Sequence, residues 1–287
     1  MGFDRLTVIG VGLIGGSFAL AARSRHLVKH VIGVARSEAT RQVALECGVA
    51  DEVTADAAAA AASADLIYLA CPVGAMGSVM EAIAPVVQPG ALVTDAGSTK
   101  AHVVDLAAQH LEGRCAFVAG HPMAGSDQAG PAAARDDLFE DKPYILTPTP
   151  TTHYQDLARL RDFIQALGAH VVLADAEQHD RLVAATSHLP HLVAAALCTA
   201  LADLASRTGD VLPFTGTGLR DATRIAKGPS EVWRDILLDN RDNVKAALQL
   251  FSAEVNRYLV AMEAEDGAAL ESLLREAQTF RKGLDEA

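Results

Sequence analysis

The glycine-rich segment at residues 10–15 constrains the fold of this chain more than any other feature. The apolar run Leu6–Ile9 leads into Gly-Val-Gly-Leu-Ile-Gly, and an alanine-rich stretch of helical composition follows. Gly10 permits a tight turn, Gly12 lets the backbone approach a pyrophosphate, and Gly15 lets the helix pack closely on the strand. We therefore expect a strand, a turn and a helix whose N-terminus binds phosphate. The alternative is the same tight turn without a ligand.

The end of the second predicted strand, residues 30–34, is where the ribose of a dinucleotide would be recognised. Sites that prefer NAD usually have an acidic residue there, but this chain has Ala-Arg-Ser at positions 35–37. Arg36 and Ser37 could bind a 2′-phosphate instead. The sequence therefore favours NADP, and NAD stays open because Glu38 could reach a ribose hydroxyl.

Short apolar strands alternate with helical segments over the first part of the chain. Further strands are predicted at 65–70, 91–95, 142–148 and 169–173, and helices at 55–63, 75–86 and 152–167. This alternation predicts an α/β fold with a doubly wound, mostly parallel sheet of the Rossmann type. We expect a dinucleotide-binding domain at residues 1–174.

From residue 175 onward the pattern is helical throughout, which predicts an all-α C-terminal domain at 175–287. Long amphipathic helices are expected at 231–262 and 266–282. Their leucines and alanines supply core and a surface for self-association.

The carboxyl ends of parallel strands share one edge of the sheet, and ligands bind at that edge. The loops predicted to meet there are 10–16, 71–74, 95–100 and 119–130. His121 stands between a glycine and a proline, which predicts a titratable side chain on a tight loop after a strand. We expect Ser98 near His121; the alternative role, an N-cap of the following helix, is compatible with this placement. The residues expected to contact the cofactor are Gly10, Gly12, Leu13, Ile14, Gly15, Arg36, Ser37, Cys71 and Pro72.

The first helix of the all-α part contains two histidines beside a proline. Pro190 removes a backbone hydrogen bond and predicts a kink in a helix that continues to about Ser206. His188 and His191 lie on one face, but no third ligand is near in the sequence, so no metal site is predicted. We assign His191 to the functional site, the alternative being a histidine satisfied within the core.

A basic cluster beside the only tryptophan is the candidate receptor for an anionic ligand. Arg220, Arg224 and Lys227 follow the i, i+4, i+7 spacing of one helix face, and Trp233 is close in the sequence. A guanidinium binds a carboxylate through two parallel hydrogen bonds. The alternative is a solvated face whose charges pair with neighbouring acidic residues.

The composition favours a small-molecule partner. A net charge of −12 and a pI near 5.2 oppose binding to nucleic acid or to an anionic membrane surface, because both need a basic footprint. The four cysteines show no metal-ligand spacing, so we expect buried, reduced thiols. We find neither a signal-peptide pattern nor a long unbroken apolar span, and we expect a cytoplasmic protein.

Five motifs occur in an order and at a spacing that are found together in one enzyme family. They are GVGLIGGS at 10–17, DAGSTK at 95–100, GHPMAG at 120–125, SHLPH at 187–191, and DATRIAK through WRD at 221–235. Over nearly the whole chain they resemble the prephenate/arogenate (cyclohexadienyl) dehydrogenases of tyrosine biosynthesis. The resemblance implies a dinucleotide-binding domain, a helical domain that forms a homodimer, and oxidative decarboxylation of prephenate or arogenate with NAD(P)⁺.

The resemblance also implies roles for individual residues. His121 is similar in position to the family's catalytic histidine, which is hydrogen-bonded to the ring hydroxyl of the substrate. Ser98 is similar to a serine that contacts the same hydroxyl near the nicotinamide. His191 resembles a residue of the substrate site, Arg224 the arginine that binds the ring carboxylate, and Trp233 a tryptophan of the same pocket.

One departure from the family pattern leaves the substrate open. Many members have Glu, often followed by Lys, after the HPxAG turn, whereas this chain has Asp127 and Gln128. We expect Asp127 to contact the pyruvyl or alanyl side chain that distinguishes prephenate from arogenate. The sequence decides neither this choice nor whether tyrosine inhibits the protein.

Two alternative functions remain. One is a related Rossmann-plus-helical dehydrogenase or reductase, such as a β-hydroxyacid dehydrogenase. That class relies on a lysine in the helical half, where this chain has His-Leu-Pro-His. The other is a catalytically silent NADP-binding regulator, against which the joint presence of the four site residues Ser98, His121, His191 and Arg224 counts.

Overall fold

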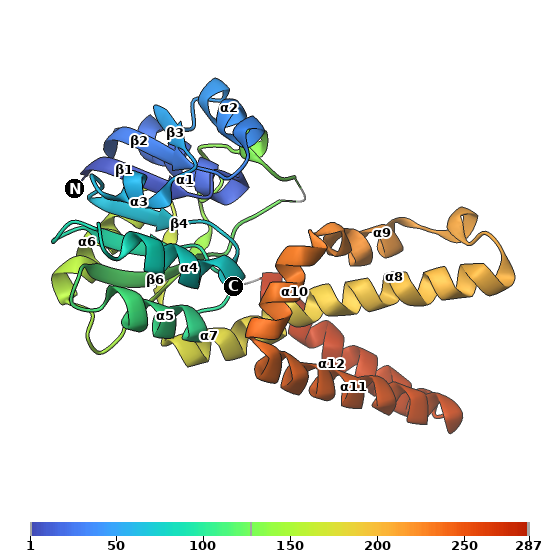
Figure 1. Cartoon of the computed structure of the whole chain (residues 1–287). Coiled ribbons are helices and arrows are strands. Elements are labelled where there is room, and N and C mark those ends of the chain that lie inside the picture. The colour runs from blue at the N-terminus through green and yellow to red at the C-terminus, as the bar shows by residue number, and fades with distance from the viewer. Residues whose placement is uncertain (1, 127, 286–287) are drawn as a thin grey trace. The chain divides into compact units, whose positions relative to one another are not determined.

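An eight-stranded sheet dominates the first part of the computed structural model, which describes residues 2–126 and 128–285. The strand order is β3-β2-β1-β4-β5-β6-β7-β8, and every neighbouring pair is parallel except β6 with β7. Figure 1 shows these strands with helices packed around them. The strands are β1 (Phe3–Ile9), β2 (Val28–Val34), β3 (Glu52–Thr54), β4 (Leu66–Leu69), β5 (Leu92–Asp95), β6 (Ala116–Pro122), β7 (Pro143–Thr147) and β8 (His170–Leu173).

Two groups of apolar side chains fill the two faces of the sheet. One face packs against α1 (Leu13–Ser24), α2 (Glu38–Glu46) and α6 (Tyr154–Ala166). The other packs against α3 (Ala57–Ala61), α4 (Val73–Ile83) and α5 (Ala101–Leu111). Every residue of β4 and β5 is buried, which explains their unbroken apolar runs. The predicted doubly wound, mostly parallel sheet is confirmed.

His121 lies within strand β6 rather than on the expected loop. In the antiparallel register His121 stands opposite Ile145, and Pro122 stands opposite Tyr144 of β7. The proline favours extended backbone in the residue before it, and extended backbone can pair with a strand. The prediction of a tight loop was wrong because it gave the glycines more weight than this preference. The short strand β3 was not predicted, since three residues carry too little pattern.

The helical part begins with one continuous segment. Helix α7 (Ala176–Val183) passes into a π-helical turn, η2 (Ala184–His188), and then into α8 (Leu189–Thr208). Pro190 lies in the first turn of α8, directly after the π-helical turn. A π-helical turn accommodates a local change in the backbone hydrogen-bond pattern. The expected distortion near Pro190 therefore takes this form.

Two of the later helices differ from their predicted bounds. Helix α9 (Thr217–Thr223) ends before Arg224, and a 3-10 turn, η4 (Arg224–Lys227), follows. The basic residues therefore do not share one continuous α-helical face. The helix expected at 231–262 is divided at Asn240 into α10 (Ser230–Asp239) and α11 (Arg241–Glu263), and the last helix is α12 (Gly267–Asp285).

By its internal contacts the chain forms two compact units, Met1–Asn240 and Arg241–Ala287. The first contains the sheet and all helices through α10. The second contains α11 and α12, between which Arg257 and Glu276 form an ion pair of 3.5 Å. This division by contacts does not test where the two predicted domains meet, so the domain boundary near residue 174 stays a prediction.

The helical segment Ala176–Thr208 is long and apolar enough to cross a membrane by length and composition alone. Only 11% of its most apolar window is buried in the structure. Helix α8 therefore presents apolar surface, including Leu197 and Leu204, that a further partner can cover.

Candidate active site

The first turn of α1 has the features of a binding site for the phosphates of a dinucleotide. Gly12 is the N-cap, and no side chain of the described residues caps this turn. The first backbone N–H groups and the positive end of the helix dipole are therefore left for an anion. Gly10 has a φ of 105°, and a Cβ at Gly15 would overlap the Gly10 carbonyl oxygen. A Cβ at Gly12 would meet nothing within 4 Å, so the space beside this turn is open. These residues fit a dinucleotide.

The residues predicted to flank the cofactor follow the two strands on either side of β1. Arg36 and Ser37 come directly after β2, where Ser37 is the N-cap of α2 and accepts a hydrogen bond of 3.0 Å from the Thr40 N–H. Cys71 and Pro72 follow β4. Burial raises the pKa of the Cys71 thiol to about 12, and the positive charge of Arg36 opposes this rise. Arg36 is therefore close enough to act on the loop after β4.

All four cysteines are free thiols. Cys47 and Cys198 are exposed, so the expectation of buried thiols was wrong for these two. Cys47 is the C-cap of α2 and Cys198 lies on α8, both at solvent-facing positions where a small residue is accepted as readily as at a buried one.

His121 belongs to a buried chain of three titratable side chains. Its Nδ1 lies 2.8 Å from His179 Nε2, and His179 Nδ1 lies 2.8 Å from Asp180 Oδ1. Burial lowers the pKa of His121 well below its usual range, and nearby His179 and Lys100 lower it further. His121 is therefore a neutral imidazole at pH 7. Its Nε2 makes no hydrogen bond to a described residue, and the ring keeps 8% of its surface exposed.

Asp180 connects this chain to the start of helix α5. Its carboxylate accepts hydrogen bonds from the backbone N–H groups of Lys100 at 2.7 Å and Ala101 at 2.9 Å. Burial alone would raise the pKa of Asp180, but the hydrogen bonds from His179 and from these two N–H groups outweigh burial and lower it. The N-cap position of α5 is Lys100, and Asp180 supplies the capping carboxylate. The alternative role of Ser98 as the N-cap is therefore wrong.

A buried ion pair fixes the strand that carries His121. The side chains of Lys100 and Asp95 pair with no exposed surface. Lys100 Nζ also donates a hydrogen bond of 2.7 Å to the Gly120 carbonyl, and Asp95 Oδ1 accepts one of 3.0 Å from the Gly120 N–H. Both backbone groups of the residue before His121 are thus held by this pair.

Further rings continue the cluster towards α10. Asn240 Nδ2 donates to the Asp180 carbonyl at 2.7 Å and lies 3.3 Å from His188 Nδ1. Burial lowers the pKa of His188 to about 4. The Trp233 ring lies 6.2 Å from the His188 ring and stacks on the His191 ring at a centroid distance of 3.5 Å. His121, His191 and Trp233, which are far apart in the sequence, therefore belong to one connected cluster.

Ser98 and Arg224 border this cluster. The backbone of Ser98 lies near the His188 ring and opposes the lowering of the His188 pKa. Even so, His188 Nε2 meets the distance and angle limits of a hydrogen bond with no described residue. The backbone of Ile225, the residue after Arg224, acts in the same way on His191. Arg224 itself is exposed.

Three of the four basic residues beside the cluster have no salt bridge to an acidic residue in the described part of the chain. Among the described residues, no salt bridge joins Arg220, Arg224 or Lys227 to a carboxylate, whereas Arg234 pairs with Asp235 at 2.7 Å. Pairing of these three side chains with acidic neighbours is therefore not seen among the described residues, and all three are exposed to solvent. Their positive charge is left for a ligand.

Two models of known protein families match this chain. The family description "Prephenate dehydrogenase, nucleotide-binding domain" matches residues 18–173, and "Prephenate dehydrogenase, dimerization domain" matches residues 175–276. This chain belongs to the prephenate dehydrogenase family. The resemblance inferred from the five motifs is confirmed.

Relatives within the prephenate dehydrogenase family cover the chain almost from end to end. The prephenate dehydrogenase of Bacillus subtilis is 37% identical over 98% of this chain and 76% of the relative. The cyclohexadienyl dehydrogenase of Zymomonas mobilis is 35% identical over 98% of this chain and 96% of the relative. A crystal structure of prephenate dehydrogenase from A. aeolicus in complex with hydroxyphenyl propionate and NAD⁺ matches with a TM-score of 0.91 and 32% identity, over 99% of both chains.

Sequence reasoning missed several residues that shape the site of this prephenate dehydrogenase family member. The sequence analysis gave no role to His179, Asp180, Lys100 or Asn240. The available signal was a His-Asp pair early in a helix, at positions that become buried. Asp127 lies outside the described residues, so its predicted contact with the substrate stays a prediction. In the described part of the chain, no group of three His, Cys, Asp or Glu side chains could hold a metal ion.

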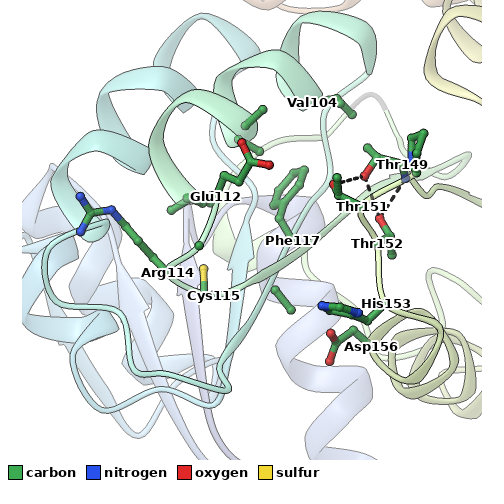
Figure 2. Close-up of a pocket in the computed structure, with 16 residues that line it drawn as sticks. Val104, Glu112, Arg114, Cys115, Phe117, Thr149, Thr151, Thr152, His153 and Asp156 are labelled. Carbon is green, nitrogen blue, oxygen red and sulfur yellow. Dashed lines mark hydrogen bonds between the residues drawn. The ribbon is translucent and has the colours of Figure 1, made fainter.

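Two cavities lie outside the cluster. One, of about 660 Å³, is formed by the end of α5, the start of β6 and residues 149–156 (Figure 2). Glu112, Arg114, His153 and Asp156 are among its lining residues. Because it meets β6 at its start and His121 is near the end of that strand, this cavity is separate from the active site. The other, of about 360 Å³, lies between Leu13 and the loop after β6.

Proposed function

We propose that this protein is an NAD(P)-dependent dehydrogenase that oxidatively decarboxylates prephenate or arogenate, giving 4-hydroxyphenylpyruvate or tyrosine. One observation carries the proposal. A neutral, buried His121, whose Nε2 has no hydrogen bond to a described residue, lies on the sheet edge that also bears an open glycine turn without a side-chain cap from the described part of the chain. Membership of the prephenate dehydrogenase family supports this choice of reaction over other hydride transfers.

In this reaction the bound nicotinamide supplies the hydride acceptor. His121 Nε2 accepts the proton of the ring hydroxyl as hydride leaves the same ring carbon. The bond between the opposite ring carbon and its carboxylate then breaks, CO₂ departs, and the electron pair completes an aromatic ring, whose oxygen takes the proton back from His121 Nε2 to give the phenol. A positioned base of this kind contributes roughly 10²–10⁴ in rate. We propose that the Ser98 hydroxyl contacts the same substrate hydroxyl.

The remaining site residues bind and orient the substrate. Arg224, which has no salt bridge to a described residue, is our candidate for the ring carboxylate. It must not stabilise that carboxylate so strongly that CO₂ cannot leave, so its contribution is orientation. The stacked rings of His191 and Trp233 form a wall of the pocket in this proposal. Asp127 is the candidate for contact with the pyruvyl or alanyl side chain.

We propose NADP as the preferred cofactor, with NAD as the alternative. The support is the exposed Arg36 and the Ser37 hydroxyl after β2, together with the missing carboxylate. The related structure from A. aeolicus holds NAD⁺, so the preference has to be measured for this chain.

Replacing Arg36 tests the cofactor proposal. In Arg36→Ala the KM for NADP⁺ is expected to rise at least about tenfold, because one charge-assisted contact contributes about 1.5–3 kcal/mol. The KM for NAD⁺ should change less than about threefold. Arg5→Ala, which removes an exposed arginine from the start of β1, is the matched control. Equal effects on both cofactors would contradict a role for Arg36 at the 2′-phosphate.

We also propose that the protein is a cytoplasmic homodimer that associates through its helical domain, with the domain boundary near residue 174. The match to a dimerization domain over residues 175–276 and the exposed apolar surface of α8 support self-association. Neither a nucleic acid nor a membrane is part of the proposal.

The experiment that tests the proposed function combines the purified full chain with prephenate or arogenate and with NAD⁺ or NADP⁺. Formation of reduced nicotinamide and release of CO₂ are followed in all four mixtures. We expect equal amounts of both products in at least one mixture. A folded protein that binds a dinucleotide but is silent in all four would instead favour a related dehydrogenase or a silent regulator.

A further inference from the structure

We infer that His179 and Asp180 are positioning residues, which hold the proton of His121 on Nδ1 and leave its Nε2 free to act as the base. The inference rests on the proposed function, since it names the groups on which that base depends. It is carried by a run of hydrogen bonds that joins helix α7 to strand β6.

Asp180 determines which atom donates and which accepts in each hydrogen bond of this run. Its Oδ1 faces the Lys100 N–H at 2.7 Å and His179 Nδ1 at 2.8 Å, and its Oδ2 faces the Ala101 N–H at 2.9 Å. Two of these three neighbours are backbone donors, and an ionised carboxylate can only accept. His179 Nδ1 must therefore carry a proton and donate it.

The proton position on His179 in turn determines the proton position on His121. A neutral imidazole has one donor nitrogen and one acceptor nitrogen, so His179 Nε2 is the acceptor once Nδ1 donates. The 2.8 Å contact between His179 Nε2 and His121 Nδ1 then requires a proton on His121 Nδ1. The lone pair of His121 is left on Nε2, which makes no hydrogen bond to a described residue.

The opposite direction would need a positive charge on His179. An imidazolium at His179 would donate to His121 Nδ1 and move the neutral His121 proton to Nε2, where it would block the base. The buried Lys100 ammonium, which donates to the Gly120 carbonyl beside His121, opposes a second cation in the cluster. The titratable or charged groups that face His121 are His179 and Asp180 of α7, His188 of η2, Lys100 beside α5, and Asp95 of β5 through Gly120.

The same run stabilises the product of proton transfer. When His121 Nε2 takes the substrate proton, its Nδ1–H continues to donate to His179, and the Asp180 carboxylate stands one ring further on. The positive charge of the protonated His121 ring therefore forms beside the His179 acceptor and near the Asp180 carboxylate. Other sites in which a second group orients a catalytic histidine stabilise the ring in the same way. Loss of His179 removes both the tautomer control and this stabilisation.

Two variants of His179 separate positioning from packing. His179→Leu removes the acceptor, and we expect kcat to fall about a hundredfold or more, within the range that a positioned base contributes. His179→Gln keeps an oxygen for His121 and an amide donor for Asp180, so its kcat should stay within about tenfold of the parent chain. In both variants the KM for substrate and cofactor should change less than about threefold. His170→Leu, at an exposed histidine of β8, is the matched control and should leave kcat unchanged.

A double variant tests whether His179 acts through His121. In a His121→Asn chain, the additional His179→Leu change should cost less than about twofold, because residues that act as a unit are not additive. A full additive loss would overturn the inference and leave His179 with a packing role. A His179→Leu chain that keeps parental kcat would overturn it as well.

A spectroscopic measurement decides the inference without turnover. With ¹⁵N-labelled histidines, long-range ¹H–¹⁵N spectra near pH 7 should show His121 protonated on Nδ1 alone, with its signals assigned by their loss in His121→Asn. The Nδ1 form should persist in His179→Gln and be lost in His179→Leu. A proton on Nε2 in the parent chain would overturn the inference. If the parent chain turns over neither prephenate nor arogenate, the proposed function fails, and this spectrum still decides the tautomer.

Discussion

Gly228 lies where the His191 and Trp233 rings stack, and its missing side chain leaves room for both. A Cβ at residue 228 would lie 2.8 Å from Trp233 Cδ1 and 3.1 Å from His191 Cε1. The backbone there has a φ of −55°, which any residue adopts, so crowding is the sole effect of an added methyl group.

Gly228→Ala should therefore displace the ring stack and raise the KM for substrate. Overpacking costs about 1–3 kcal/mol, which corresponds to a rise of about fivefold to about a hundredfold. The KM for cofactor should stay within about twofold. Gly216→Ala, where an added Cβ meets nothing within 4 Å, is the matched control in steady-state kinetics. An unchanged substrate KM in Gly228→Ala would remove the His191–Trp233 stack from the substrate pocket.

The sequence identified residues with an unusual local setting and missed those whose setting is tertiary. His121 and Gly10 could be identified because glycine and proline at and beside them restrict the backbone in ways that indicate a functional turn or strand end. His179 is separated from His121 by 58 residues, and nothing in its own neighbourhood indicates that the two rings meet. In the sequence Asp180 is an ordinary acidic residue of a helix, and only the fold brings it to the start of α5.

At the scale of elements, strand β6 and helix α5 are held together by one buried ion pair. Lys100 and Asp95 have no exposed surface, and together they bind both backbone groups of Gly120. Removing one partner of such a pair leaves a buried charge without compensation, which costs about 3–5 kcal/mol.

Lys100→Met should accordingly lower the free energy of unfolding by about 3–5 kcal/mol, measured by urea denaturation. Lys29→Met is the control, because Lys29 pairs with Asp4 at 2.8 Å on the surface, where both side chains are largely exposed. Its urea midpoint should not move measurably. A Lys100→Met chain with the parental midpoint would show that the pair does not stabilise this edge of the sheet.

The elements that the sequence predicted well are those with a strong periodic or apolar pattern. Strands β4 and β5 were found because both faces are covered, so that β4 is apolar throughout and β5 is apolar until Thr94 and Asp95 at its end. The assignment of His121 to a loop failed because strand pairing with β7 is a non-local choice. The break between α10 and α11 at Asn240 was missed because the amphipathic pattern continues across this residue. The Asn240 side chain donates a hydrogen bond to the Asp180 carbonyl, a contact that the sequence does not indicate.

At the scale of the whole molecule, the exposed apolar surface of α8 predicts association of two copies. The chain has a mass of 30.0 kDa, so light scattering should give about twice that value. Leu204→Glu places a charge on this surface, at a residue 46% exposed, and should shift the mass towards that of one chain. Leu45→Glu, at a residue 39% exposed on α2, should leave the mass unchanged. A single-chain mass for the parent protein would contradict self-association through the helical domain.

Turnover of His121→Asn tests the central claim, that a neutral His121 base carries the chemistry, most directly. The variant is compared with the parent chain and with His170→Asn in the substrate and cofactor mixture that gives the highest rate. We expect kcat to fall by about 10²–10⁴ while the affinity for cofactor and the circular dichroism spectrum stay unchanged. His121→Asn turning over as fast as the parent chain would contradict the account.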